Sequence, residues 1–346
     1  MRGEIGIGVA DGRPGYLVFE SGGAYNCIAN VNDEMSDKEA REPRSSRNSN
    51  LPKAAMFTPT IPGPDPDTKT PKFKLPPLAC DAHCHIFGPG SKYPYAADLP
   101  YTPPDAPLEA FRALHAKLGI GRAVIVNASV HGTDNRVALD AIAASNGAYR
   151  AVANINDEIT ERELRGLHDG GFRGCRFNFV RHLGGVPDMA VFDRVIQMIA
   201  PLGWHVDLHF DAIDLPEYAG MLARLPVRYT IDHMGRVKAA DGLDQLSFQT
   251  LIELMKRDEK CWVKVCGCER VSSAGPPFVD AVPFARRIIE TAPDRVIWGT
   301  DWPHPNVKVM PNDGDLVDLI PLFAPEPEFQ HKILVANPAR LFEFDS

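Results

Sequence analysis

The sequence predicts a (β/α)8 TIM barrel, an α/β fold, preceded by an N-terminal extension. Eight short apolar runs rich in β-branched residues alternate with amphipathic stretches over residues 79–346. Strands that alternate with helices form parallel sheets, and eight such repeats close a barrel. A doubly wound open sheet is the alternative, but it gathers its ligand site at one switch point. Here polar residues follow nearly every apolar run, which favours the barrel.

The predicted elements follow one another in strict order along the chain. The strands are apolar, β-branched runs at residues 79–85, 122–128, 150–155, 173–179, 204–210, 228–233, 261–266 and 295–300. The helices are amphipathic stretches at residues 107–118, 136–147, 160–169, 189–201, 214–224, 246–257 and 280–291.

Residues 1–78 differ in composition from the rest of the chain. Residues 36–78 are rich in Pro, Lys, Arg, Asp, Ser and Asn and have no hydrophobic period. Such a segment cannot bury enough apolar surface to order itself. Residues 1–34 are Gly-rich, and Met35 and Met56 are alternative initiators to Met1. We therefore expect a largely irregular or disordered extension over residues 1–78, flexible or draped on the surface, and a barrel over 79–346.

Composition excludes several classes of partner. A net charge of -8 argues against nucleic-acid binding, which usually needs a basic face. No apolar stretch approaches the length of a membrane span, and the N-terminus lacks a signal-peptide pattern. The 7 cysteines form no CxxC pattern, and several fall in predicted strands, which indicates free thiols and a cytoplasmic location. We expect a monomer or a small homo-oligomer acting on a small molecule.

Candidate metal ligands stand at the ends of several predicted strands. His83 and His85 end the first strand and should face the same side, with Cys84 pointing away. Taken alone, such a pair is more often two ordinary core or surface histidines. Further candidates end later strands: His209, His233 and Asp301. Strand ends converge at the mouth of a barrel, so three imidazoles and a carboxylate there indicate a catalytic zinc site.

Polar side chains after the second strand are candidates for substrate binding. Ser129 and His131 precede Asp134 and Asn135, either of which is suited to cap the next helix. Ser129 and His131 are better placed to face a ligand, although an ordinary turn is the alternative.

Arginines follow the fourth and seventh strands. Arg176 and Arg181 are spaced to clamp a carboxylate or sulfonate, although Arg176 has an alternative role as the partner of an acid inside the barrel. Arg270 is a further anion-binding candidate, and a solvated loop arginine is its alternative. His205 lies deeper on the fifth strand and is expected to be a core histidine. His115, His168 and His331 fall on predicted helices at solvent or packing positions.

At these residues a resemblance to a known family becomes specific. The stretches Asp81 to His85, Ile231 to Arg236 and Trp298 to Pro305 resemble the amidohydrolase superfamily. Within it they are most similar to the branch that contains 2-pyrone-4,6-dicarboxylate lactonase and 4-sulfomuconolactone hydrolase. Further similar stretches lie at residues 128–135, 176–179, 274–277 and 330–332, so the resemblance covers residues 79–343.

The resemblance implies hydrolysis of a lactone bearing acidic groups, in the breakdown of aromatic compounds. It implies that Asp301 is the general base for water. The predicted substrate-binding set comprises Ser129, His131, Arg176, Asn178, Arg181 and Arg270.

Two departures from the pyrone lactonase bear on metal and substrate. That enzyme is a metal-independent member without a histidine at the strand-5 position, where this chain has His209. It also carries a substrate-binding arginine where this chain has His182, next to Arg181. Both departures favour a zinc-dependent relative acting on a muconolactone.

We therefore expect a metal-dependent lactonase with one divalent ion, zinc or alternatively manganese. The expected ligands are His83, His85, His209 and Asp301, with His233 polarising the lactone carbonyl or adding to the metal sphere. Metal-bound water, deprotonated by Asp301, would open 4-sulfomuconolactone or a similar muconolactone. The alternatives are a metal-independent 2-pyrone-4,6-dicarboxylate lactonase, a related barrel decarboxylase, or a non-catalytic barrel that binds an acidic metabolite. A carboxylate at the centre of the site argues against the last, because it would repel an anion.

Overall fold

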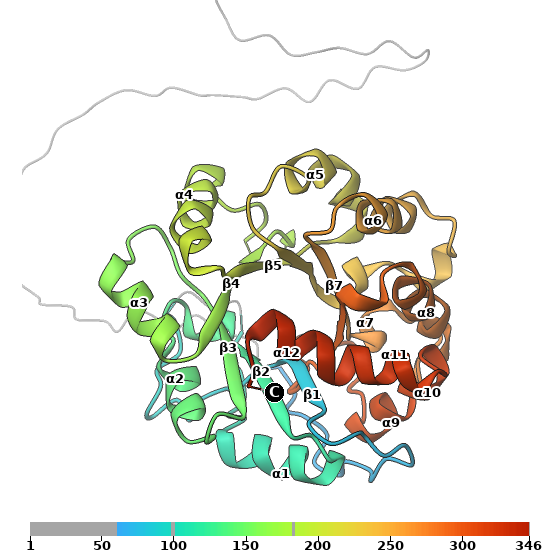
Figure 1. The fold of residues 1–346 in the computed structure, drawn as a ribbon. Coiled ribbons are helices and arrows are strands. Elements are labelled where there is room, and N and C mark those ends of the chain that lie inside the picture. The colour runs from blue at the N-terminus through green and yellow to red at the C-terminus, as the bar shows by residue number, and fades with distance from the viewer. Residues whose placement is uncertain (1–60, 98–100, 182–183, 346) are drawn as a thin grey trace, which may run out of the picture. The chain divides into compact units, whose positions relative to one another are not determined.

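Eight parallel strands pair in chain order from β1 to β8 (Figure 1). The computed structural model describes residues 61–97, 101–181 and 184–345. The strands are β1 (Cys80–Cys84), β2 (Arg122–Val126), β3 (Tyr149–Ala153), β4 (Phe172–Asn178), β5 (His205–His209), β6 (Tyr229–Ile231), β7 (Cys261–Val265) and β8 (Val296–Trp298). Backbone bonds beyond β8 complete the ring: Asp301 N donates to His83 O at 2.7 Å, and His85 N donates to Trp302 O at 2.7 Å. The predicted barrel is confirmed.

Helices surround this barrel because each predicted amphipathic stretch buries one apolar face against the sheet (Figure 1). They are α1 (Leu108–Leu118), α2 (Arg136–Ala143), α3 (Glu161–Asp169), α4 (Met189–Ile199), α5 (Leu215–Leu222), α6 (Leu246–Arg257) and α8 (Val282–Thr291). Helix α3 begins with a capping box, in which Thr160 Oγ1 accepts from Glu163 N and Glu163 accepts from Thr160 N. Helix α7 (Cys268–Val271), which follows β7, was not predicted from the sequence.

The C-terminal helices were also not predicted, and the last of them closes one end of the barrel. They are α9 (Asp313–Asp318), α10 (Ile320–Phe323), α11 (Pro327–His331) and α12 (Asn337–Phe342). In Figure 1, α12 lies across the barrel opening. Asn337 Nδ2 donates to Val296 O at 2.7 Å, and Phe342 contacts His205, so α12 covers the end at which β8 and β5 begin. The mouth at the carboxyl ends of the strands is therefore the end left for a site.

Residues 61–78 contain no helix or strand and lie against α9. Lys69 N donates to Asn312 Oδ1 at 2.9 Å, and Phe73 N donates to Asp318 Oδ1 at 2.8 Å. The side chains of Phe73 and Leu75 pack on the core. This part of the predicted extension is draped on the barrel, and residues 1–60 lie outside the described residues.

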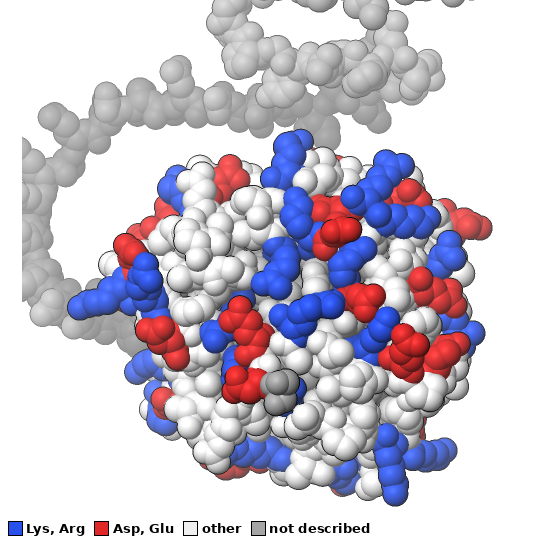
Figure 2. Space-filling model, in the orientation of Figure 1, with Lys and Arg blue, Asp and Glu red and all other residues white. Residues whose placement is uncertain are grey.

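The surface charges, the helices and the cysteines agree with the predictions made from the composition. Figure 2 views the end covered by α12 and shows Lys and Arg interspersed with Asp and Glu. Within the described ranges, no helix combines the length and apolar composition needed to cross a bilayer. The cysteines in these ranges are free and buried: Cys80, Cys84, Cys175, Cys261, Cys266 and Cys268.

Candidate active site

The predicted histidines and Asp301 meet at the mouth of the barrel. The ring centroids of His83 and His85 lie 5.1 Å apart, those of His83 and His233 4.7 Å apart, and those of His209 and His233 5.1 Å apart. Asp301 Oδ1 lies 3.3 Å from His85 Nε2 and 3.6 Å from His83 Nε2. The convergence of strand ends expected from the sequence is present.

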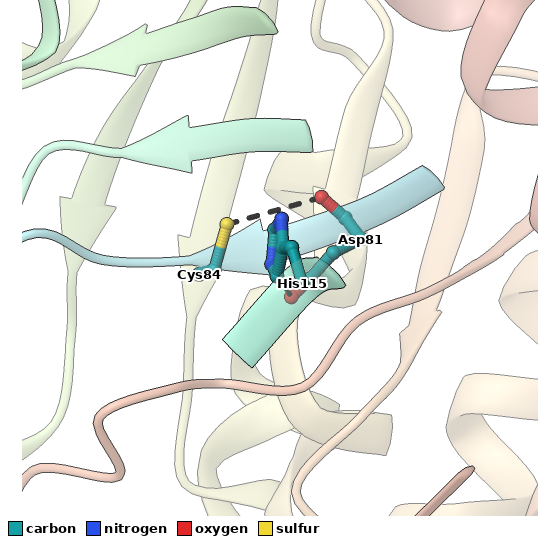
Figure 3. A group of neighbouring side chains, drawn as sticks. All are labelled: Asp81, Cys84 and His115. Carbon is teal, nitrogen blue, oxygen red and sulfur yellow. Dashed lines mark hydrogen bonds and ion pairs between the residues drawn. The ribbon is translucent and has the colours of Figure 1, made fainter. Parts of the chain in front are cut away.

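Cys84 points away from this cluster, as predicted for the middle residue between two histidines. Figure 3 shows it beside Asp81 and His115. The Asp81 carboxylate is 3.2 Å from His115 Nε2 and accepts from Thr300 N at 3.0 Å and from Thr300 Oγ1 at 2.5 Å. Cys84 Sγ donates to Val124 O at 3.3 Å. This group ties α1 and β1 to the residue before Asp301 and is a framework under the site.

Asp301 has a left-handed backbone conformation with φ of 68°. A Cβ at the nearby Gly299 would lie 2.5 Å from His83 N, so only glycine lets the end of β8 approach β1 this closely. Arg270 Nε donates to Asp301 Oδ2 at 2.7 Å. Burial alone would raise the pKa of the Asp301 carboxyl, but Arg270 and the neighbouring histidines together outweigh it and hold the pKa well below its usual range.

Three of the histidines at the mouth, His83, His209 and His233, are buried and neutral. Burial is the largest cause that lowers the pKa of His83, His209 and His233 well below the usual value for an imidazole. Nearby positive charges add to this, Lys264 for His83 and Arg176 for His209.

Charged side chains line the barrel interior below the mouth, where aliphatic residues are usual. Arg176 on β4 donates to Asp232 Oδ2 at 2.9 Å, which is the alternative role left open for it. Lys264 on β7 lies 3.2 Å from Asp232 Oδ1 and is also paired with Asp207 on β5. Lys264, Asp207 and Asp232 were not among the site residues predicted from the sequence. The signal that could have found them is a charged residue inside an otherwise apolar run.

A pocket at the mouth is lined by most of the predicted site residues. Among the described residues, its predicted members are His85, Ser129, Arg176, His209, His233, Arg270 and Asp301. Its other members are Phe87, Tyr101, Ala128, Pro305 and Asn306. Tyr101 was missed because it lies in a loop with no motif around it, and Asn306 because it stands one residue beyond the Trp298 to Pro305 stretch.

Three residues predicted to bind substrate are not in this lining. Asn178 Nδ2 donates to Ser129 Oγ at 3.2 Å, so Asn178 positions a lining residue. His131 Nε2 accepts from Gly88 N at 3.2 Å and its ring stacks on Tyr95, which is a packing role. Arg181 is exposed.

Three further predictions from the sequence concern Asp134, His205 and His182. Asp134 Oδ1 accepts from Arg136 N at 3.0 Å, the first amide of α2, whereas the N-cap residue Asn135 makes no side-chain cap bond. His205 is buried and bonded to Asp207 at 3.0 Å, which confirms it as a core histidine. His182 lies outside the described residues.

The four predicted zinc ligands are not brought together as one set. Ligand atoms of His83, His233 and Asp301 lie within 4.8 Å of one another. Of the groups that the described residues form at this spacing, none includes His85 or His209. The negative charge of Asp301 is also already balanced by its ion pair with Arg270.

The hydrogen bond to His83 also opposes metal binding. Lys264 Nζ lies 3.0 Å from His83 Nδ1, and an ammonium can only donate. Nδ1 is therefore the acceptor, the proton of the neutral ring is on Nε2, and that nitrogen offers no lone pair toward Asp301. A metal-binding nitrogen must offer a lone pair. The arrangement therefore does not fit the expected zinc site.

Comparisons with known proteins agree with the resemblance seen in the sequence and with the fold. The amidohydrolase family model matches residues 80–344. The chain is 47% identical over 281 residues to a 2-pyrone-4,6-dicarboxylate hydrolase of Comamonas testosteroni, covering 79% of this chain and 92% of that protein. It is 44% identical over 293 residues to a 4-sulfomuconolactone hydrolase of Hydrogenophaga intermedia, covering 84% and 96%.

A solved structure extends the comparison to three dimensions. It is that of a probable 2-pyrone-4,6-dicarboxylic acid hydrolase from Acinetobacter baumannii with citric acid bound. The TM-score is 0.68 at 26% identity, over 77% of this chain and 100% of the other. The chain belongs to the amidohydrolase family.

Proposed function

We propose that this protein hydrolyses a small lactone that carries acidic groups, of the muconolactone type and including 4-sulfomuconolactone. The observation that carries the proposal is a buried carboxylate, Asp301, in a pocket whose wall also holds Arg176 and Arg270. Two curated relatives of this chain are named as hydrolases of anionic lactones, and a solved relative holds citric acid. A site that only bound an anion would gain nothing from Asp301 at its centre.

In the proposed reaction, Asp301 takes a proton from the attacking water. Its Oδ1 is the less engaged oxygen, because Oδ2 is bound to Arg270 at 2.6 Å and Oδ1 has only the longer contact with His85 Nε2, at 3.3 Å. The hydroxide oxygen adds to the lactone carbonyl, the ring C–O bond breaks, and the proton passes to the departing ring oxygen. His233 polarises the carbonyl, and Arg176 and Arg270 hold the acidic groups against the base.

The geometry favours the metal-independent mode among those that the sequence left open. The proton on His83 Nε2 and the contact of Arg270 with Asp301 support this choice. The zinc-dependent mode stays a prediction, as do manganese as an alternative ion and a cytoplasmic location.

The test is turnover by the purified full-length chain together with its metal content. Hydrolysis of 4-sulfomuconolactone and of 2-pyrone-4,6-dicarboxylate would be measured before and after a chelator, with zinc or manganese added back. We expect turnover of 4-sulfomuconolactone to exceed that of the pyrone and to persist after chelation. Loss of activity that zinc restores would establish the metal-dependent mode. Absence of turnover of either lactone would refute the proposed function.

A further inference from the structure

Lys264 is a fully buried lysine in the interior of the barrel, below the pocket. Its ammonium is paired with Asp207 and lies 3.2 Å from Asp232 Oδ1. Burial alone would lower the pKa of this ammonium, but the two carboxylates outweigh it and raise the pKa above its usual value. Lys264 is therefore charged, and its third contact is His83 Nδ1, at 3.0 Å.

That third contact determines where the proton of His83 lies. Because an ammonium has three donors and no acceptor, Nδ1 must accept. The neutral ring then carries its proton on Nε2. This nitrogen is buried, has no hydrogen-bond partner among the described residues, and lies 3.6 Å from Asp301 Oδ1.

The neighbouring histidines have the opposite arrangement. His85 Nδ1 lies 2.8 Å from Val126 O, and His209 Nδ1 lies 3.0 Å from Asn178 Oδ1. Both oxygens are acceptors, so each Nδ1 donates. The Nε2 of His209 then accepts from Arg236 at 3.4 Å, whereas the Nε2 of His85 lies 3.3 Å from Asp301 Oδ1. Of these three rings, only His83 has a hydrogen-bond donor, Lys264, at its Nδ1.

We propose that Lys264 is a positioning residue that holds His83 in the Nε2–H tautomer, so that His83 donates to the lactone carbonyl oxygen as negative charge develops there. This role rests on the proposed function and deepens it. A preorganised donor in a buried site stabilises that charge without reorganisation. The other role open to Lys264 is that of a counter-ion to Asp207 and Asp232 with no effect on the tautomer.

The two roles differ in what happens when the ammonium is removed. Asp232 Oδ1 lies 3.5 Å from His83 Nδ1. In Lys264→Met this carboxylate becomes the nearest partner, and since it can only accept, the proton should move to Nδ1. Nε2 would then lose its proton and could no longer donate to a carbonyl.

The first measurement reads the tautomer in the wild-type protein without substrate. Nitrogen-15 NMR of histidine-labelled protein distinguishes protonated from bare ring nitrogens, and the His83 signals are assigned by their loss in His83→Asn. We expect a bare Nδ1 and a protonated Nε2. A proton on Nδ1 in the wild-type chain would overturn the proposal whatever the activity is.

The second measurement compares variants. In Lys264→Met we expect the proton on Nδ1 and a fall in kcat of about 10²–10³, with KM nearly unchanged. Lys264→Met combined with Asp207→Asn removes one charge of each sign and should show the same effects if the single variant fails to fold. Lys260→Met, a lysine that binds the backbone carbonyl of Leu225, should leave the tautomer and kcat unchanged. An unchanged tautomer in a folded Lys264 variant would reduce Lys264 to a counter-ion. Absence of lactone turnover in the wild type would refute the proposed function but not the tautomer.

Discussion

Asp301 and His233 are both held in left-handed backbone conformations, with φ of 68° and 52°. Such conformations are uncommon for residues other than glycine and cost free energy that the surrounding structure must offset. At Asp301 the restraint comes from its backbone bond to His83 O and from Thr300 bound to Asp81. Asp301 acts on the water and His233 on the carbonyl in the proposed reaction. Both are therefore held in strained, preorganised conformations.

Asp301→Asn tests the base directly. Asparagine tolerates a positive φ, so the backbone should be retained while the proton acceptor is lost. We expect kcat to fall by about 10²–10⁴. Unchanged thermal unfolding would show that the fold is intact, and Asp169→Asn on the exposed end of α3 is a matched control. Near wild-type turnover by Asp301→Asn would remove Asp301 from the mechanism.

Arg270→Met tests how the charge of Asp301 is maintained. In the wild type Arg270 holds the pKa of Asp301 low, so the base stays ionised and kcat/KM should fall only in acid, below about pH 4. Without Arg270, burial raises the pKa, and the acid limb of the profile should move to higher pH. KM should also rise, because an anionic substrate loses a charge-assisted contact.

The pH profile of kcat/KM, with Arg286→Met on α8 as the control, checks this. An acid limb that stays in place would show that Arg270 does not set the charge of Asp301.

At the scale of elements, the segment over residues 61–78 connects to the site through α9. Asn312, the N-cap of α9, donates to Asp65 Oδ2 at 2.8 Å and accepts from Lys69 N at 2.9 Å. The next residue, Asp313, lies 3.1 Å from Nε2 of His304. His304 N in turn donates to Asp301 O at 2.8 Å. Residues 61–78 therefore support α9, and α9 in turn supports the loop that carries Asp301.

Two truncations separate the parts of the extension. A chain that starts at Met56 should keep its stability and turnover, because the residues removed have no core-forming period. A chain without residues 1–75 loses the contacts of Phe73 and Lys69. Its free energy of unfolding should fall by about 1–3 kcal/mol, and turnover should fall with it. Urea unfolding measures the free energy of unfolding, and kcat measures the turnover. Equal stability of the two truncated chains would show that residues 61–75 do not support α9.

For the whole molecule, burial of neutral histidines links stability to pH. The pKa of His83, His209 and His233 lies well below that of the unfolded chain, chiefly because of burial. Below about pH 6.5 the unfolded chain therefore binds protons that the folded chain does not. Stability rises with pH in that range and is lost as pH falls.

Urea unfolding at pH 7.5 and 5.5 tests this linkage. The free energy of unfolding should fall by up to about 1.4 kcal/mol per pH unit for each of these histidines. His209→Asn should flatten the dependence, whereas His331→Gln, at an exposed position on α11, should not change it. Stability that rises between pH 7.5 and 5.5 would contradict the assignment of neutral buried histidines.

Local patterns in the sequence were sufficient for the barrel and for much of its mouth. The apolar run at 204–210 and the amphipathic stretch at 246–257 correspond closely to β5 and α6. The hydrophobic period of a strand or helix depends only on residues that are neighbours in the sequence, so it can be recognised without the tertiary structure. His83, His209 and Asp301 were found because they follow such runs, and every strand of a barrel ends at the same mouth.

Pairings between strands were decided only by the tertiary structure. Arg176, Asp232 and Lys264 come from three different strands or their ends, and no period relates them. The contact with Asp232 directs Arg176 toward the barrel interior. The contact with Lys264 sets which ring nitrogen of His83 carries the proton. Whether the expected zinc site forms was undecided for the same reason, since a sequence shows which histidines reach the mouth but not which group their other ring nitrogen contacts. That partner is set by packing between distant segments, and it decides whether an imidazole donates or accepts.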